Sequence, residues 1–559
     1  MPAGRASVDD ASFNRQNAVR AAAAVRKLAD PKVAAVTEEG RPESASSTGI
    51  PDSGGEPSNR GLITACVILA TLLQSLDSTI ANVALPYMQG SMSASQDEIN
   101  WVLTSYIVAA AIMTAPVGFL AARFGRTRLF VTSVVGFTAA SVLCGMAQSL
   151  GQIVVFRVLQ GMFGAALVPL SQAVLFDIYS VKQRGAAMAI WGMGVMVGPI
   201  LGPTLGGWLT ENYDWRWVFY INVPFGVLAA IGIMLLLEET PRRRSTRIDW
   251  IGFSALSLAV GSFQMMLDRG EVLDWFSSSE IITWACLAGL GFYFFLVQLS
   301  FGHNPFLSPR LFSDLNYVIG LIFMFVVGLI LYATLALLSP YLQILMNYPV
   351  VTTGLLLAPR GIGTMVAMVL CARLVGRVSV RLLVGLGFVA NAYALYDMTT
   401  WTPDVSEWTV FVVGFVQGLS IGLVFVPLST VAFSTLPLEL RIEATGVFSL
   451  IRNIGSAIGI SITGALLQSN TQINHALIGN SITPFNRTLF AGHILRFWSP
   501  ENLHGAAVLN EEITRQASTI AYVDDFKLML VLALAAMPFV FFLRTERQRP
   551  AASGHAAME

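Results

Sequence analysis

One carboxylate lies inside an apolar stretch of the chain, and its position has a chemical implication. Asp77 is set within residues 62–86, LITACVILATLLQSLDSTIANVALP. At about 1.5 Å per residue, a helix of this length crosses a hydrocarbon layer about 30 Å thick, so Asp77 would lie far from either surface. A charge at that depth is costly, and by default it indicates a site for a proton or a cation. The alternative is a structural Asp that neighbouring hydroxyl or amide groups hold in place.

Helical spacing divides this stretch into two faces. The polar face contains Gln74, Asp77, Ser78, Ala81 and Asn82. The apolar face contains Leu72, Leu73, Leu76, Ile80 and Val83. We expect the polar face to look at protein or a water-filled cavity and the leucine face to contact lipid. The amides of Gln74 and Asn82 are then candidate substrate-binding groups.

A buried cation in a second apolar stretch is the expected partner of the acid. Arg157 lies in residues 152–176, on one helical face with Gln160. We expect Arg157 to pair with a carboxylate, directly or through water, and so to tune that carboxylate's affinity for a proton. A fixed structural ion pair is the alternative. Gln160 joins the candidate substrate-binding residues.

The second half of the chain places two more cations in apolar stretches. Arg360 and Arg452 are these cations, and Gln417 and Asn453 add amides. Together they could bind an anionic or polar part of a substrate. Arg360 could equally lie close enough to the outer interface for its guanidinium to reach water.

Glycines recur along the stretch 186–209, which also contains two prolines. The glycines follow one another every four residues and remove side chains along one stripe, while each proline deletes a helix hydrogen bond and bends the axis. This pattern predicts a tight, kinked seam, which serves either as a conformational hinge or as packing alone. Its residues are Gly194, Gly198, Pro199, Gly202, Pro203 and Gly206.

The composition indicates an all-α polytopic membrane protein. Of 559 residues, 54% are hydrophobic and only 12% are charged, too few charges to cover a globular surface of this size. The formal net charge is zero, so nothing points to nucleic acid as a partner. The four lysines do not follow glycine, so no Walker A phosphate loop is present. We also find no metal-ligand cluster and no hydrolase motif. We therefore expect no enzyme activity, no metal and no cofactor.

Fourteen apolar stretches recur along the chain, and the loop charges support that even count. Arginine and lysine fall mostly on the loops that an N-terminus inside the cell would make cytoplasmic, which predicts that both termini are cytoplasmic. The stretches are residues 62–86, 99–121, 129–148, 152–176, 186–209, 217–237, 250–267, 281–301, 317–342, 353–375, 382–400, 408–433, 444–467 and 526–543.

An internal repeat divides these helices into two sets. AARFGRTRL at 121–129 resembles ARLVGRVSVRL at 372–382, and the pair Gln160-Gly161 recurs as Gln417-Gly418. We expect two six-helix bundles with two inserted helices, and a substrate site near the midplane between the bundles. The expected parts are a disordered cytoplasmic tail (1–60), an N-terminal bundle (61–240), a linker with two helices (241–303), a C-terminal bundle (304–545) with a long outer loop (468–525), and a second tail (546–559).

Several motifs together resemble the major facilitator superfamily, in its fourteen-helix drug:proton antiporter branch of EmrB/QacA type and closest to the EmrB subgroup. They are LDSTIANVALP (76–86), GFLAARFGRTRLF (118–130), FRVLQGMFGA (156–165), the Gly-Pro stretch (194–207), WRWVFYINVPFG (215–226) and LAPRGIGTM (357–365). The second motif implies that Arg123, Gly125 and Arg126 take part in gating. Where that motif usually has an acidic residue, this chain has Ala122, so the usual charge relay cannot operate in its ordinary form.

The resemblance implies proton-driven export of hydrophobic or amphipathic toxic compounds across the inner (plasma) membrane by alternating access. In this hypothesis Asp77 accepts the proton, Arg157 tunes the proton affinity of Asp77, and the Gly-Pro stretch flexes. The implied partners, besides lipid, are a periplasmic membrane-fusion adaptor (EmrA-like) and an outer-membrane channel (TolC-like). Two other functions remain open: export of one metabolite, such as an aromatic or fatty acid, and a membrane scaffold or receptor that transports nothing.

Overall fold

A computed structural model describes residues 59–180, 183–239, 249–302, 307–374, 377–437, 440–482 and 503–543. Within these residues the secondary structure is helical, with no β-strand. The expected tails lie outside the described residues, except for residues 59 and 60. The all-α class predicted from composition is therefore confirmed.

Six spans make up the N-terminal bundle, and three of them are broken into two helices each. The breaks follow local chemistry: at Pro116 the missing N–H interrupts the ladder, and α4 and α5 meet there with a bend of 58°. The helices are α3 (Arg60–Met92), α4 (Gln96–Thr114), α5 (Val117–Phe124), α6 (Arg126–Met146), α7 (Leu150–Gly164), α8 (Leu167–Ile178), α9 (Arg184–Asn212), α10 (Trp217–Tyr220) and α11 (Asn222–Leu236).

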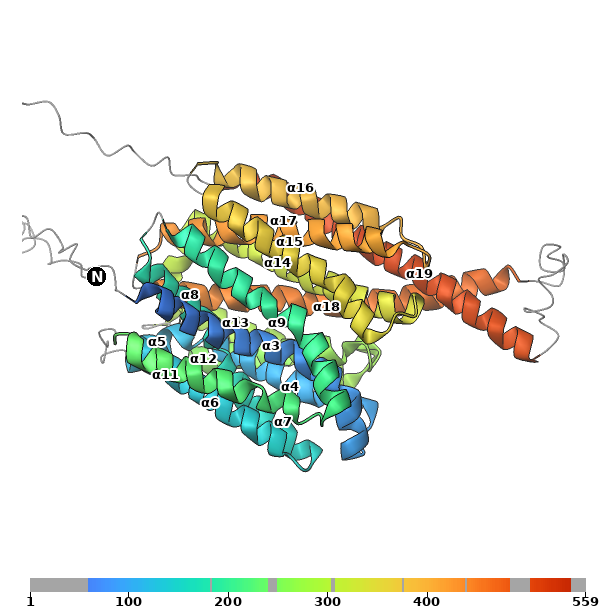
Figure 1. Ribbon diagram of the computed structural model, residues 1–559, viewed down its shortest axis with the longest axis horizontal. Coiled ribbons are helices and arrows are strands. Elements are labelled where there is room, and N and C mark those ends of the chain that lie inside the picture. Colours follow the sequence, from blue (N-terminus) through green and yellow to red (C-terminus); the bar gives the residue numbers. More distant parts are fainter. Residues whose placement is uncertain are drawn as a thin grey trace, which may run out of the picture. The chain divides into compact units, whose positions relative to one another are not determined.

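Two further helices separate this bundle from the second one. They are α12 (Trp250–Gly270) and α13 (Ser279–Phe301), which pack against each other. The C-terminal bundle contains α14 (Leu315–Pro340) with the π-helical turn η3 (Tyr341–Leu345), α15 (Val350–Leu374), α16 (Val380–Met398), α17 (Glu407–Ser434), α18 (Arg441–Asn480) and α19 (Leu503–Ala536) with the 3-10 turn η6 (Met537–Phe542). In Figure 1 helices α3–α11 lie mostly below α14–α17.

The expected fourteen helices are present, although their hydropathy differs. In the described part of the chain, 12 helices are long and apolar enough to cross a membrane, or up to 13 if α4 and α5 form one span. The remaining helix is α16, with 19 residues. Arg381, Asn391 and Asp397 make α16 less apolar than its neighbours, and it packs against α17 and α19.

Helix packing repeats between the bundles. Helix α3 packs against α9 and α11, and α14 packs in the same way against α18 and α19. The pair α4 and α7 has its counterpart in α15 and α17, and the pair α6 and α7 in α16 and α17. The two six-helix bundles inferred from the sequence repeat are thus present.

The expected lipid-facing leucine face of α3 is wrong. Leu73, Leu76 and Ile80 are 1%, 5% and 0% exposed, respectively. They are covered because α9, α11, α8 and α4 all pack against α3. The exposed strip of α3 instead runs through Ser78 and Asn82.

The region between the last two helices also differs from the expected loop 468–525. Helix α18 continues to Asn480 and α19 begins at Leu503, so both ends of that region are helical. In Figure 1 the ends of α18 and α19 extend past the other labelled helices. Residues 483–502 lie outside the described part.

The seam between α3 and α9 is built around the predicted glycines. A Cβ on Gly198 would lie 2.6 Å from the Ser75 hydroxyl, so only glycine lets the two backbones approach this closely. Pro199 has no N–H for the carbonyl of Val195, one turn earlier. The Ser75 hydroxyl donates to that carbonyl at 2.8 Å. A side chain of α3 thereby replaces the hydrogen bond that the proline removes from α9.

Candidate functional site

Asp77 and Arg157 form an ion pair inside the N-terminal bundle. Nη1 of Arg157, on α7, donates to Oδ2 of Asp77, on α3, at 2.7 Å. Both side chains are 0% exposed. The pairing expected from the two isolated charges is therefore present, and it explains how both charges can be buried.

Two amides complete the contacts of the carboxylate. Gln160 Nε2 donates to Asp77 Oδ1 at 2.9 Å, and Asn222 Nδ2, at the start of α11, donates to the same oxygen at 3.1 Å. Asn222 also donates to the Ser141 hydroxyl on α6 at 3.0 Å. The carboxylate thus accepts three hydrogen bonds from two other helices, a pattern that fits its ionised form.

Arg157 is held on its other sides as well. Its Nε donates to the backbone carbonyl of Val102, on α4, at 3.0 Å, and its Nη1 also donates to Gln160 Oε1 at 2.8 Å. The guanidinium carbon lies 4.3 Å from the centre of the Tyr106 ring, a cation–π contact. One guanidinium therefore links α3, α4 and α7.

The two charges of this network balance each other. The pair carries one positive and one negative charge, and Nη2 of Arg157 has no hydrogen-bond partner among the described residues. Protonation of Asp77 would remove the negative charge and leave Arg157 uncompensated. Because an uncompensated buried charge is costly, each of the two charges depends on the other.

The other predicted groups of the first bundle lie outside this network. Asn82 is exposed and Gln74 is half-buried on α3, and Oε1 of Gln74 has no partner in the described part. Gln160 was predicted as a substrate-binding residue, but its amide donates a hydrogen bond to the carboxylate of Asp77.

The predicted residues of the second bundle divide between two places. Arg360 is 6% exposed and its Nη2 donates to the Leu331 carbonyl at 2.9 Å, so its guanidinium lies inside the bundle rather than at an interface. Gln417 is 0% exposed. Arg452 and Asn453 are half-buried neighbours on α18, joined by a hydrogen bond of 3.4 Å.

The predicted gating residues surround the junction of α5 and α6. Gly125 adopts φ +95°, which favours glycine, and a Cβ there would collide with the Glu239 carboxylate. Arg126 forms an ion pair with Asp177 of α8. The Arg123 guanidinium carbon lies 6.0 Å from the centre of the Phe124 ring.

The rest of the predicted seam repeats the contact made at Gly198. Gly194 packs against Ile68, Gly202 against Thr79 and Gly206 against Ile80. Pro203 lies in the same helix, α9. The stripe thus faces α3 along several turns, on the helix that carries Asp77.

The two bundles meet at the end of the molecule where α5 ends and α18 begins. Gly118 has no room for a Cβ against the backbone of Glu443, and the Thr445 hydroxyl donates to the Pro169 carbonyl at 3.3 Å. Phe176 and Phe433 meet edge to face with 5.1 Å between ring centres. This junction is one of the contacts between the bundles, which also meet where α9 packs against α15.

Sequence reasoning missed three partners of the central pair. They are Asn222, Ser141 and Tyr106. Asn222 had a signal, because it is an amide at the edge of an apolar stretch. The other two had none, since Ser and Tyr are common in membrane helices and only packing brings Ser141 to Asn222 and Tyr106 to Arg157.

Comparison with known proteins agrees with this architecture. The family model described as Major Facilitator Superfamily matches residues 67–460. The chain is 34% identical over 490 residues to the multidrug export protein EmrB of Escherichia coli (strain K12), across 86% of this chain and 95% of that protein. It is also 34% identical over 485 residues to the fatty acid resistance protein FarB of Neisseria gonorrhoeae, across 86% and 96%, respectively.

A solved structure shares the fold. The crystal structure of the human organic anion transporter MFSD10 (TETRAN) aligns with a TM-score of 0.56 at 15% sequence identity, across 85% of this chain and 99% of that one. The chain thus has the fold of a transporter, and its sequence relatives are efflux proteins. It therefore belongs to the major facilitator superfamily, as a multi-pass membrane transporter of the EmrB-type multidrug efflux branch.

Proposed function

We propose that the protein is a drug:proton antiporter that exports hydrophobic or amphipathic compounds across the inner membrane. The observation that carries this proposal is the ion pair between Asp77 and Arg157, fully buried in a membrane bundle. An ionisable pair at that depth indicates a proton or ion pathway more often than a support for the fold.

The proposed cycle uses the contacts of the pair. With Asp77 ionised, its carboxylate binds α7 and α11 to α3. A proton from the outer side neutralises Asp77, frees Arg157 and weakens the hold between α3 and α7. This shift favours one facing state of the two bundles, and release of the proton on the cytoplasmic side restores the other.

The Gly-Pro seam and the junction at Gly118 supply the moving contacts of this cycle. The seam lets α9 slide on α3 without side-chain obstruction. The junction joins the two bundles, and in this cycle it opens when they rock. Asn82, on the exposed strip of α3, and the half-buried Gln74 two turns before it are proposed to contact substrate.

Orientation and partners follow from charge and similarity. The distribution of Arg and Lys supports cytoplasmic termini. The likeness to EmrB over nearly its whole length, together with the helical extensions of α18 and α19, supports work in a tripartite system. In it these extensions would face a periplasmic membrane-fusion adaptor, which leads to an outer-membrane channel.

A second function has one observation in its favour. The similarity to FarB, which is a fatty acid resistance protein, equals the similarity to EmrB in identity. A narrow exporter of one such compound would protect cells against that compound only. A resistance panel in cells that lack their own efflux pumps separates the two functions.

Dye export from vesicles tests the proton coupling. In everted vesicles, whose cytoplasmic face points outward, the native chain should export a lipophilic dye into the lumen when the lumen is made acidic, and Asp77→Asn should not. The matched control is Asp397→Asn, because Asp397 is another helix carboxylate whose contact with the Trp401 indole, at 3.0 Å, an amide oxygen can also make. Gradient-driven export by Asp77→Asn at the native rate would refute the proposal, and a lack of dye counterflow in the native chain would favour a scaffold.

A further inference from the structure

The position of Asp77 has a counterpart in the second bundle. The glycine contacts align the two helix pairs. On α9, Gly202 packs against Thr79, which lies two positions after Asp77 on α3. On α18, Gly459 packs against Leu329, which lies two positions after Val327 on α14. Because α3 with α9 and α14 with α18 are equivalent pairs, Val327 occupies the position of the acid.

The glutamine–glycine pairs align two further helices. The glycine after Gln160 leaves no room for a Cβ against the carbonyl oxygen of Tyr106, on α4. The glycine after Gln417 packs in the same way against the carbonyl of Arg360, on α15. Gln417 is thus the counterpart of Gln160, and Arg360 stands at the position of Tyr106.

The buried cation therefore lies on helices that are not equivalent: Arg157 is on α7 in the first bundle, and Arg360 is on α15 in the second. Gly414, three residues before Gln417, stands at the position of Arg157. The matching burial patterns of α6 and α16 also pair Ser141 with Asn391. The second bundle keeps one cation and two amides around this point, but a valine replaces the carboxylate.

Around this point of the second bundle, atoms of two polar side chains lack hydrogen-bond partners among the described residues. Arg360 uses Nη2 on the Leu331 carbonyl, whereas its Nε and Nη1 are buried and have no hydrogen-bond partner among the described residues. Neither amide atom of Gln417 has a partner there either. A buried charge without a counter-charge is strongly unfavourable, so this arrangement calls for an anion.

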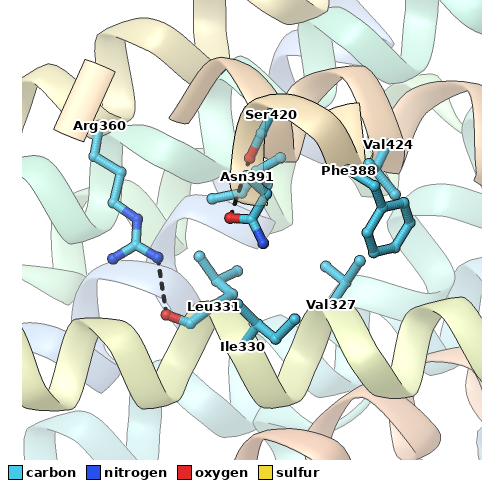
Figure 2. Close-up of a pocket in the computed structure, with 9 residues that line it drawn as sticks. Val327, Ile330, Leu331, Arg360, Phe388, Asn391, Ser420 and Val424 are labelled. Carbon is cyan, nitrogen blue, oxygen red and sulfur yellow. Dashed lines mark hydrogen bonds between the residues drawn. The ribbon is translucent and has the colours of Figure 1, made fainter. Parts of the chain in front are cut away.

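A small cavity opens beside these groups. It has room for about one or two water molecules. Figure 2 shows the Asn391 amide nitrogen pointing into the space between Arg360 and Phe388, while the Asn391 oxygen accepts from Ser420. The lining residues are Val327, Ile330, Leu331, Arg360, Phe388, Asn391, Ser420, Ile421 and Val424.

We propose that this cavity binds a single carboxylate group beside Val327, the residue that stands at the position of Asp77. The guanidinium of Arg360 supplies the charge, and its free N–H groups and the Asn391 amide supply the donors. One cation, apolar walls and a small volume select a monovalent, carboxylate-sized anion over sulfate or phosphate. The carboxylate belongs either to a small free anion or to a transported compound, and the second case rests on the proposed efflux function.

Acetate binding to the purified chain in nanodiscs tests the site. Sodium acetate, against sodium sulfate at equal ionic strength, should raise the thermal unfolding temperature of the native chain. Arg360→Gln should lose that rise, whereas Arg452→Gln, which removes the half-buried cation on α18, should keep it. Val327→Asp should also lose the rise, because its own carboxylate fills the site, and Val327→Asn should weaken acetate binding much less. We expect a loss of affinity of roughly tenfold or more in Arg360→Gln and Val327→Asp.

Two results would overturn the proposal: no acetate-specific rise in the native chain, or an equal rise in Arg360→Gln. If the site is present, competition identifies the source of the anion. Dodecanoate that displaces acetate and is exported in an Arg360-dependent way indicates a transported carboxylate, whereas acetate binding without such competition indicates a free anion. Asp77→Asn should retain the acetate rise, so failure of the efflux proposal and failure of the anion site are distinguishable.

Discussion

Charge removal at the buried pair should reveal its energetic coupling. Asp77→Asn keeps the size and the acceptor oxygen of the side chain but leaves Arg157 as an uncompensated buried cation. Arg157→Gln leaves the carboxylate of Asp77 with two amide donors and also frees the Val102 carbonyl. Because removal of one partner from a buried ion pair costs about 3–5 kcal/mol, we expect each single variant to lose about 3 kcal/mol of stability.

The double variant Asp77→Asn, Arg157→Gln should cost no more than either single change. Both buried charges are then gone, and two neutral amides can hydrogen-bond to each other and to Gln160. The sum of the single effects would be about 6 kcal/mol, so a double-variant cost of about 3 kcal/mol corresponds to a coupling of about 3 kcal/mol, the upper end for contacting residues. Equilibrium unfolding in nanodiscs, with the double cycle, measures this coupling.

Additive losses in that cycle would refute the reasoning, because they would mean that the two charges are stabilised independently. The matched control is Arg269→Gln with Glu280→Gln. That pair lies at 2.8 Å but is partly exposed, at 32% and 41%. Its coupling should be under about 1 kcal/mol.

Three further predictions concern the moving contacts. Ser75→Ala should lower stability by about 1 kcal/mol in the same unfolding assay, because it leaves the carbonyl freed by the seam proline without a donor; an unchanged value would contradict this. Gly198→Ala should sharply reduce the yield of folded protein on size-exclusion chromatography. Gly207→Ala should be tolerated, since its Cβ would lie 4.0 Å from the nearest atom. Equal yields of the two variants would count against a tight seam. In a chain without its native cysteines, a reducible bifunctional thiol reagent that joins cysteines placed at Phe176 and Phe433 should stop dye export until the reagent is cleaved. Continued export by fully cross-linked protein would show that this junction need not open.

The charged residues were the most predictable part of the site. Asp77 and Arg157 stood out because a charge inside an apolar stretch must find a partner, and the structure joins them. Asn222 was less predictable as a partner of this pair, since it comes from α11, far along the chain, and no spacing relates it to α3. Sequence spacing reports which residues share a face of one helix, but not which other helix covers that face.

The same limit explains the error on α3. Its leucine face was expected to contact lipid because leucine is compatible with acyl chains. Leucine is equally compatible with a helix interface, and Leu73 and Ile80 are covered by neighbouring helices. Hydrophobicity alone does not distinguish these two apolar surroundings.

The ends of α18 and α19 show a related limit. Residues 468–480 and 503–525 contain enough polar groups to resemble a loop, so their place in the long helices α18 and α19 was not expected from hydropathy. Helices that leave the hydrocarbon layer need no apolar periodicity all round, and each of these two supports the other by packing. Arg360 was predicted as a candidate for binding an anionic group, but the place of the site was out of reach, because Val327 carries no chemical signal until the two bundles are compared.

Proton release on substrate binding tests the role of Asp77 most directly. Purified protein in detergent, in weakly buffered solution with a pH indicator, receives a substrate identified by the resistance panel. The native chain and Asp397→Asn should release protons when substrate binds, and Asp77→Asn should release none while it still binds the substrate. Undiminished proton release from Asp77→Asn would contradict the assignment of Asp77 as the group that couples protons to export.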